Sequence, residues 1–320
     1  MRYAHYSLSL AVLFTAPGCK PPVNLTPPPA AAEAKVVALS GASVMVGVGD
    51  IASCTQRLSI GTAALVDSVL HADSLAKVND AVFTLGDNVY TSGTSAQFAN
   101  CFTPTWGDPQ KRIMKELHPT PGNHEYLTVA ADPYFAYFGK AAGAVGQGYY
   151  SYDVGAWHVI VVNSEIIVDL VFDDAARKAQ MDWVENDLKA HKTLCTIAYW
   201  HHPRFSSGWH GSNAALGALW QLLYDNNVDL VLSGHDHDYE RFRPMTPAGV
   251  ADTARGMTEI VAGTGGEELR GFANHHLPNS VYQIEGRAGV LLLTLGAAEY
   301  RSAFLEIGGR VWDQSGGKCH

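Results

Sequence analysis

In the segment AVFTLGDNVY, residues 81–90, a short apolar run over 81–85 leads into Gly86-Asp87. Such a run, closed by a turn signal, predicts a buried strand. The same pattern occurs upstream, where the strand predicted over 43–48 ends in Gly49-Asp50. Between these two strands, residues 58–77 carry apolar side chains at helical spacing. Strands that alternate with helices in this way indicate an α/β fold.

The rest of the chain continues the alternation and adds a second group of strands. An extended piece reaches Thr120-Pro121 and ends at Gly122-Asn123. Two β segments over 149–153 and 157–163 have hairpin-like spacing, which predicts a second sheet. After residue 243 the chain is Gly-rich and strand-like, without a long helical period. The remaining predicted elements are helices over 173–190 and 213–225 and strands over 194–200, 228–233, 259–262 and 290–295.

The composition is that of one large globular domain. The chain has 320 residues, 47% hydrophobic and 17% charged, and we find neither an internal repeat nor a second core. The formal net charge of -9 disfavours a nucleic-acid partner other than a substrate, because such binding depends on a cationic surface. The chain has 14 His against 22 Lys and Arg, and imidazole is the commonest metal ligand among side chains. The positions of these His residues therefore decide whether the chain binds metal. The composition does not indicate an oligomeric state.

The first 43 residues have the pattern of an export signal followed by a tether. An apolar run over 8–16 is too short to span a bilayer and suits a signal peptide over 1–19. Small residues before Cys19 resemble a bacterial lipoprotein cleavage site, so lipidation of Cys19 and release without a lipid both remain open. The Pro/Ala-rich composition within 20–43 predicts an extended tether. We expect an exported protein, periplasmic, cell-surface or secreted, whose folded domain spans 44–320.

Four further cysteines form an even set, which is consistent with disulfides in an oxidising compartment. The preferred pairing is Cys54 with Cys101 and Cys195 with Cys319, because Cys54 and Cys101 each follow a strand that ends in the candidate site. Four cysteines allow three pairings, and buried free thiols are an alternative. The sequence leaves these possibilities open.

Five polar motifs follow strands or extended segments in a fixed order. A single Gly-Asp pair after a strand is more often a turn than a site, but five ordered motifs indicate shared chemistry. Two neighbouring metal ions need a bridging carboxylate and a mixture of N and O ligands, and Asp87 is the candidate bridge. The motifs are Gly49-Asp50, Gly86-Asp87-Asn88-Val89-Tyr90, Gly122-Asn123-His124-Glu125, Trp200-His201-His202-Pro203 and Gly234-His235-Asp236-His237.

This ordered set resembles the calcineurin-like metallophosphoesterases and, within them, the purple acid phosphatases, over residues 44–320. Many members of the superfamily begin with Asp-x-His, but here Ala52 follows Asp50-Ile51, so that ligand is missing. Tyr90 stands where the purple acid phosphatases place a ferric phenolate ligand, three residues after Asp87. The resemblance implies a four-layer α-β-β-α sandwich, in which two mixed sheets are flanked by helices.

The resemblance also implies a ligand set for two ions, Fe(III) and a divalent Zn, Fe or Mn. His201 is preferred over its neighbour as a ligand because the family pattern places the ligand two residues before a Pro, here Pro203. The ferric ion would be held by Asp50, Asp87, Tyr90 and His237, and the divalent ion by Asp87, Asn123, His201 and His235.

Further residues take supporting roles by the same resemblance. His124 would lie beside a bound phosphate, and His210 would contact substrate and protonate the leaving oxygen. His202 and Arg241 would support the site from outside the ligand set, with Glu240 and Arg241 expected to form a buried ion pair. The expected activity is hydrolysis of small-molecule phosphate monoesters by a metal-bound hydroxide.

Two other functions are alternatives to the monoesterase. A phosphodiesterase acting on nucleotide or phospholipid diesters would use the same metal site, and the access loops over 92–107, 139–148 and 208–213 would separate the two. A non-catalytic surface module is disfavoured, because every ligand expected from the purple acid phosphatase pattern is present. A serine hydrolase is also disfavoured, since the chain has no Gly-x-Ser-x-Gly motif.

Overall fold

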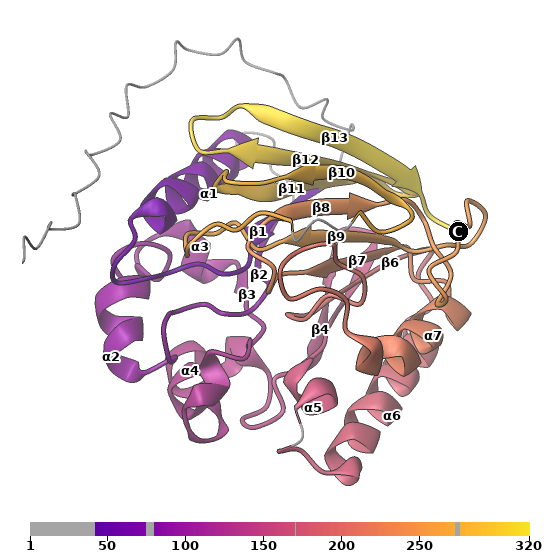
Figure 1. Ribbon diagram of the computed structural model, residues 1–320, viewed down its shortest axis with the longest axis horizontal. Coiled ribbons are helices and arrows are strands. Elements are labelled where there is room, and N and C mark those ends of the chain that lie inside the picture. Colours follow the sequence, from indigo (N-terminus) through magenta and orange to yellow (C-terminus); the bar gives the residue numbers. More distant parts are fainter. Residues whose placement is uncertain (1–41, 75–79, 170, 273–275) are drawn as a thin grey trace, which may run out of the picture. The chain divides into compact units, whose positions relative to one another are not determined.

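Two β-sheets lie between helices in the computed structural model, which describes residues 42–74, 80–169, 171–272 and 276–320 (Figure 1). Helix α1 packs against the first sheet, and α6 and α7 pack against the second. The described residues belong to one compact unit. The α/β class and the four-layer α-β-β-α sandwich are therefore confirmed. The predicted signal segment over 1–19 and most of the predicted tether over 20–43 lie outside the described residues.

The first sheet has six strands in the described part of the chain, in the order β13-β12-β11-β1-β2-β3. It is mixed, because β1 pairs in parallel with β2 and antiparallel with β11. In the parallel pair, Val48 lies opposite Thr84, so the turns after β1 and β2 lie side by side. The strands are β1 (Ser43–Val48), β2 (Asp80–Thr84), β3 (Leu117–His118), β11 (Gly289–Leu295), β12 (Glu299–Glu306) and β13 (Val311–Lys318).

The second sheet has seven strands among the described residues, in the order β10-β8-β9-β7-β6-β5-β4. Its centre is parallel, from β5 through β6 and β7 to β9, so these strands share one carboxyl edge. The outer strands β4, β8 and β10 pair antiparallel with their neighbours. The strands are β4 (Tyr150–Val154), β5 (Trp157–Val161), β6 (Cys195–Tyr199), β7 (Leu230–Ser233), β8 (Tyr239–Phe242), β9 (Thr258–Ala262) and β10 (Ser280–Ile284).

The helices of the described residues are mostly short. The long helix α6 begins after Asp173, whose carboxylate accepts a hydrogen bond from Ala176 N at 2.8 Å and so caps the helix. Among the described residues, no helix is long and apolar enough to cross a membrane. The helices are α1 (Leu58–Ser74), α2 (Ser95–Gln97), α3 (Arg112–Lys115), α4 (Asp132–Phe138), α5 (Glu165–Val168), α6 (Asp174–Ala190) and α7 (Gly217–Asp225), with single turns at Phe98–Phe102, Glu125–Leu127, Val129–Ala131, Gly139–Ala142 and Ala214–Leu216.

Alternate residues of the second sheet supply two separate cores. On β6, Ile197 and Tyr199 belong to the core shared with the first sheet, whereas Ala198 packs with α6 and α7. Because successive strand side chains point to opposite faces, a strand buried on both faces must be apolar throughout. This explains why the central strands appear in the sequence as continuous apolar runs that lead directly into polar residues.

One predicted strand was misplaced. We expected an extended piece to reach Thr120-Pro121, but β3 ends at His118. Pro119 and Pro121 carry no N–H and cannot donate to a sheet ladder, so pairing stops before them. The predicted helix over 58–77 is α1 as far as Ser74, and residues 75–79 lie outside the described residues.

The structure contains both disulfides of the preferred pairing. Cys54 joins Cys101 with their Cα atoms 4.9 Å apart, and Cys195 joins Cys319 with their Cα atoms 5.2 Å apart. Both separations fall within the ordinary range for disulfides. The second disulfide spans 124 residues and attaches the C-terminal strand β13 to β6.

A buried histidine ties α6 to the β4–β5 hairpin. His158 contacts Asp153 through Nδ1 at 2.8 Å and Asp187 through Nε2 at 2.7 Å. Ser151 also donates a hydrogen bond to Asp187, at 2.8 Å. Burial alone would lower the pKa of His158, but the two carboxylates outweigh it and raise that pKa above its usual value. His158 is therefore held between two carboxylates that favour its charged form.

The stability contribution of His158 is expected to depend on pH. Because its folded-state pKa is raised, the contribution is fully present below the ordinary imidazole pKa of about 6.5 and is lost as pH rises through the folded-state pKa. His158→Gln should lower the unfolding free energy by about 1–3 kcal/mol near pH 6 and by less at alkaline pH. Thermal unfolding of both proteins across pH tests this, and a difference independent of pH would contradict it.

Candidate metal centre

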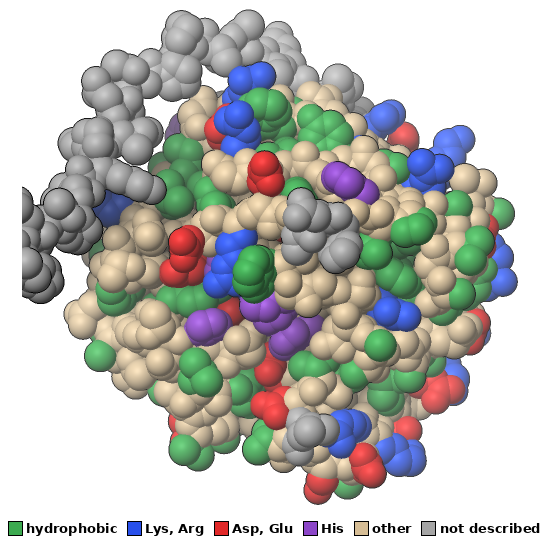
Figure 2. Space-filling view, viewed as in Figure 1, with side chains coloured by type: hydrophobic (Ala, Val, Ile, Leu, Met, Phe, Trp, Pro, Cys, Tyr) green, Lys and Arg blue, Asp and Glu red, His purple; other side chains and the backbone are tan. Residues whose placement is uncertain are grey.

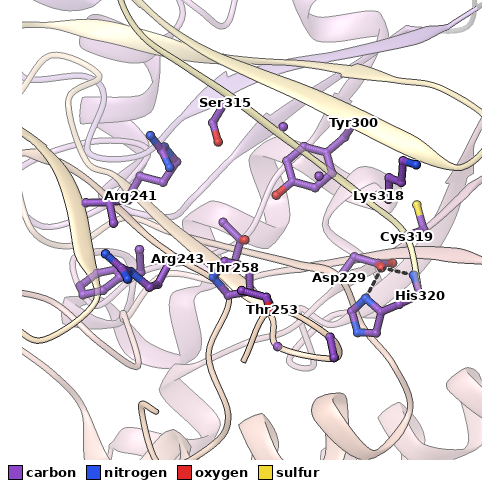
Figure 3. Close-up of a pocket in the computed structure, with 17 residues that line it drawn as sticks. Asp229, Arg241, Arg243, Thr253, Thr258, Tyr300, Ser315, Lys318, Cys319 and His320 are labelled. Carbon is purple, nitrogen blue, oxygen red and sulfur yellow. Dashed lines mark hydrogen bonds and ion pairs between the residues drawn. The ribbon is translucent and has the colours of Figure 1, made fainter. Parts of the chain in front are cut away.

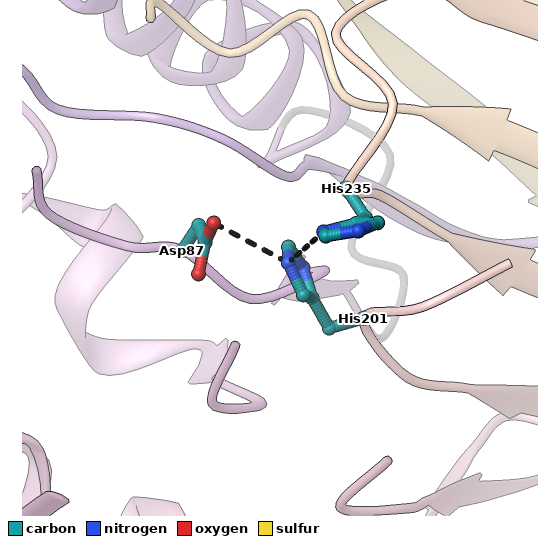
Figure 4. Close-up of side chains that lie close together, drawn as sticks. All are labelled: Asp87, His201 and His235. Carbon is teal, nitrogen blue, oxygen red and sulfur yellow. Dashed lines mark hydrogen bonds and ion pairs between the residues drawn. The ribbon is translucent and has the colours of Figure 1, made fainter. Parts of the chain in front are cut away.

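Four strand ends bring the candidate ligands together at the carboxyl edges of both sheets. Asp50 follows β1, Asp87 follows β2, His201 follows β6 and His235 follows β7. Backbone hydrogen bonds join the turns, since Asp50 N donates to Gly86 O at 3.1 Å and Gly234 N donates to His201 O at 2.9 Å. Figure 4 shows Asp87, His201 and His235 converging from three separate segments.

The first group of donor atoms surrounds the phenol of Tyr90. Its hydroxyl lies 2.7 Å from Asp50 Oδ1, 3.0 Å from Asp87 Oδ2 and 3.2 Å from His237 Nε2. His237 Nε2 lies 3.3 Å from Asp50 Oδ1. Three oxygens and one nitrogen from three segments of the chain therefore face one point.

The second group surrounds Nε2 of His201. This nitrogen lies 3.0 Å from Asn123 Oδ1, 3.1 Å from His235 Nδ1 and 3.3 Å from Asp87 Oδ2. Asp87 Oδ2 is thus an atom of both groups, while Asp87 Oδ1 accepts a hydrogen bond from His124 N at 2.9 Å. The two groups are adjacent and share one carboxylate oxygen.

Backbone carbonyls orient two of the imidazoles. His201 Nδ1 lies 2.7 Å from Leu85 O, and His237 Nδ1 lies 2.7 Å from Glu268 O. A carbonyl can only accept, so each Nδ1 carries a hydrogen and each Nε2 faces the site, where it can offer a lone pair to a metal ion once it has released its own proton. This is the arrangement by which proteins hold metal-binding histidines in one orientation and tautomer.

The turns that carry the site are conformationally strained. Asp50, Asp87 and His235 have φ values of 60°, 48° and 69°, in the left-handed region that non-glycine residues rarely adopt. Space beside them is reserved by glycine, since a Cβ on Gly122 would lie 2.3 Å from Asp87 Oδ1 and one on Gly86 would lie 2.6 Å from His201 Nδ1. These glycines therefore belong to the site.

Burial crowds the charges of the site. Burial opposes ionisation of Asp87, but His201 and His124 hold the pKa of its carboxyl well below the usual range. Against the effect of burial, Asp87 raises the pKa of His201 to about 10. Burial and the carboxylates of Asp50 and Asp87 raise the pKa of Tyr90 far above its usual value. A cation would offset the repulsion between these two carboxylates and an ionised Tyr90. The N and O donors, with one carboxylate shared between the two groups, fit two ions.

Two further predicted histidines flank the donor groups. His124 Nδ1 lies 2.5 Å from Thr91 O, which leaves Nε2 facing the site at 3.8 Å from Asp87 Oδ2. The ring of His210 lies 4.2 Å from the ring of His235, centroid to centroid, and His210 is exposed. Figure 2 shows this gathering of His side chains at the surface, with acidic side chains beside it.

The last two predicted residues lie in different surroundings. His202 lies behind the second group, with Nδ1 3.0 Å from Ser164 Oγ and 3.1 Å from Glu165 Oε1. The prediction of an ion pair between Glu240 and Arg241 is wrong, because Arg241 Nε lies 2.6 Å from Asp313 Oδ2 and pairs with that carboxylate instead. Neighbours on β8 point to opposite faces, and Arg241 lines a separate pocket of about 590 Å³ (Figure 3).

Two buried carboxylates that organise the site were missed by the sequence analysis. Glu125 accepts hydrogen bonds from Asn88 N at 2.9 Å and Gly122 N at 2.8 Å, joining two ligand-bearing loops. Asp236 accepts hydrogen bonds from Ser206 Oγ at 2.5 Å and His210 N at 2.6 Å, and so fixes the loop that carries His210. Both lie inside the quoted motifs, and their position beside candidate ligands was the available signal.

Comparison with known proteins agrees with this geometry. The family model of the calcineurin-like phosphoesterases matches residues 48–239. Purple acid phosphatase 15 of Arabidopsis thaliana is 29% identical over 196 residues, covering 51% of this chain and 36% of that protein. Acid phosphatase type 7 of Homo sapiens is 27% identical over 250 residues, covering 68% of this chain and 55% of that protein. The chain therefore spans less than two thirds of either relative.

Solved structures show the same fold. A purple acid phosphatase from yellow lupin seeds superposes with a TM-score of 0.70 at 21% identity, over 87% of this chain and 54% of that one. GAP50, an anchor in the inner membrane complex of Plasmodium, also gives a TM-score of 0.70, at 15% identity over 87% of this chain and 89% of that one. With a family match over more than half of its length and the family motifs gathered at one edge of its sheets, the chain belongs to the calcineurin-like phosphoesterases.

Proposed function

We propose that the protein is an exported phosphoesterase that hydrolyses phosphate monoesters at a dinuclear metal centre. The observation that carries this proposal is the sharing of Asp87 Oδ2 by two adjacent donor groups. One carboxylate oxygen facing two sets of N and O donors is the arrangement that a pair of ions requires. A small phosphate ester is the corresponding substrate class.

The assignment of ions follows the chemistry of the donors. A phenolate and carboxylates are hard anionic ligands, so we assign the group around Tyr90 to Fe(III). The group around His201, with two imidazoles and an amide oxygen, suits a divalent ion such as Zn, Fe or Mn. When bound, the ions supply Lewis acidity toward phosphate oxygens and lower the pKa of water so that it can act as a nucleophile.

The remaining steps belong to the residues around the ions. The Nε2 of His124 faces the site, and the ring of His210 lies against His235, so both imidazoles can reach a phosphoryl group between the donor groups. We assign two roles to these imidazoles: they stabilise the negative charge on the phosphoryl oxygens, and they transfer a proton to the leaving oxygen. Burial of the ligands below them keeps bulk water from competing for the donors.

The proposal of export rests on the cysteines and the N-terminal pattern. Two disulfides within one domain suit an oxidising compartment. The predicted signal segment over 1–19 would direct the chain to export, and the candidate lipid attachment at Cys19 would anchor it to a membrane. The mass of the mature exported protein tests both, because an acylated chain begins at Cys19 and carries the mass of its lipid.

Tyr90→Phe is expected to remove a visible absorption band. The oxidised wild-type protein should be purple, because charge transfer from phenolate to Fe(III) absorbs visible light, and the variant should be colourless. Tyr282→Phe is the matched control, since its hydroxyl contacts Trp312 O at 2.6 Å in another part of the molecule. A band that persists in Tyr90→Phe would exclude Tyr90 as the ferric ligand.

The activity itself is tested on the same sample. Two metal ions per chain and faster hydrolysis of p-nitrophenyl phosphate than of bis(p-nitrophenyl) phosphate are expected. Faster hydrolysis of the diester would make the protein a phosphodiesterase with the same site. A metal-loaded protein inactive on both substrates would reject the proposal.

A further inference from the structure

Arg270 lies at the rim of the candidate site, on a loop that the family motifs do not include. Its backbone N donates a hydrogen bond to His237 O at 3.0 Å. Its guanidinium Nη1 lies 2.6 Å from Nε2 of His210. Arg270 therefore contacts a candidate ligand through its backbone and a candidate proton donor through its side chain.

The loop over 263–270 is fixed to the centre at several points. Gly265 N donates to Gly49 O at 2.9 Å, and Glu267 N donates to Asp50 O at 3.1 Å. These bonds attach the loop to the turn that follows β1, while Arg270 N attaches it to the segment that follows β7. The position of the guanidinium is thus set by the same backbone that positions the donor groups.

The charge of Arg270 is not balanced by a carboxylate of the described residues. Its side chain makes its one polar contact there with His210, and it is only partly exposed. A guanidinium is always charged and cannot accept a hydrogen bond, so His210 Nε2 accepts and the other N–H groups of the fork stay available. An uncompensated arginine fork beside a phosphate site is suited to an anionic ligand.

The number of phosphoryl oxygens separates the two substrate classes. A phosphate monoester presents three non-bridging oxygens, whereas a diester presents two and carries an ester substituent in the third position. Two ions and one guanidinium can together satisfy three oxygens. Against a diester, the guanidinium would face a weakly accepting ester oxygen and its substituent.

We propose that Arg270 binds the third non-bridging oxygen of a phosphate monoester and thereby makes the site select monoesters over diesters. This inference rests on the proposed function, and it names the residue that sets the substrate class. The contact with the guanidinium fixes the His210 ring through Nε2, so Nδ1 carries the hydrogen and can donate a hydrogen bond to the leaving oxygen of the same substrate. The space-filling view shows a Lys or Arg side chain next to the group of His side chains on this face (Figure 2).

The test compares two substrates in matched variants of the full, metal-loaded protein. Arg270→Ala removes the fork, Arg270→Lys keeps a charge without the fork, and Arg243→Ala removes an exposed arginine of the separate pocket in Figure 3. The quantities measured are kcat/KM for p-nitrophenyl phosphate and bis(p-nitrophenyl) phosphate, the inhibition constant of inorganic phosphate, and metal content.

Arg270→Ala should lower kcat/KM for the monoester by about 10²–10³-fold, as expected for loss of a transition-state donor. The diester value should change by less than about threefold, phosphate inhibition should weaken, and metal content should not change. Arg270→Lys should be intermediate for the monoester, and Arg243→Ala should match wild type.

Equal losses on both substrates, or no loss on the monoester, would overturn the role of Arg270 while leaving a wild-type phosphatase intact. A metal-loaded wild type inactive on both substrates would instead remove the proposed function, and this inference with it.

Discussion

Asp87→Ala is expected to abolish phosphatase activity and metal retention together. Its Oδ2 lies within 3.3 Å of His201 Nε2 and 3.0 Å of the Tyr90 hydroxyl, so one substitution removes an atom from both donor groups. We expect kcat/KM for p-nitrophenyl phosphate to fall by at least about 10³-fold, because metal ions supply several kcal/mol of charge stabilisation in the transition state. The purified variant should retain almost none of the two metal ions expected per wild-type chain.

The control for Asp87→Ala is Asp225→Ala, which removes an exposed carboxylate from the end of α7. Far-UV circular dichroism checks that both variants are folded, because Asp87 is buried beside His201 and its loss leaves that imidazole without its carboxylate partner. Full activity in a folded Asp87→Ala protein would reject the dinuclear scheme. Loss of one ion with activity retained would show that Asp87 does not bridge.

Glu125→Ala is expected to be the most destabilising single change near the site. Its fully buried carboxylate accepts hydrogen bonds from Asn88 N, Val89 N and Gly122 N at 2.9, 3.2 and 2.8 Å. Alanine leaves three buried N–H groups without an acceptor, which should cost about 3–5 kcal/mol and lower Tm by roughly 5–10 °C. Thermal and denaturant unfolding of the metal-free protein measures the loss directly.

The effect of Glu125 should also extend to the metal ions. The loops that it joins carry Asp87, Tyr90 and Asn123, so loosening them should weaken metal affinity by about 10–100-fold, as is usual for residues that orient ligands. Glu125→Gln should be less severe, because one oxygen acceptor remains. Glu299→Ala, at a half-exposed position, is the control. Unchanged stability and metal affinity in Glu125→Ala would show that the loops hold their shape without this carboxylate.

Local sequence patterns were sufficient to predict the helices and strands and the polar residues at their ends. Strand β1 spans Ser43–Val48 as predicted, and the other predicted strands that lead into the site agree with β2, β6 and β7 to within two residues at their carboxyl ends. These features are local, because an apolar run closed by a turn residue can be recognised without knowledge of its neighbours. The order of five motifs was sufficient to identify the family, which the family match confirms.

Contacts between residues far apart in the sequence became visible only in the folded chain. Arg241 pairs with Asp313, 72 residues away, because β8 turns that side chain toward β13 and not toward its own neighbour Glu240. Arg270 reaches His210, 60 residues away, and His201 is oriented by Leu85 O, 116 residues away. Such contacts depend on sheet order and loop path, which leave no local pattern in the sequence. The chemistry of the donors was therefore evident from the sequence, while their support and the residue proposed to set substrate class emerged only from the fold.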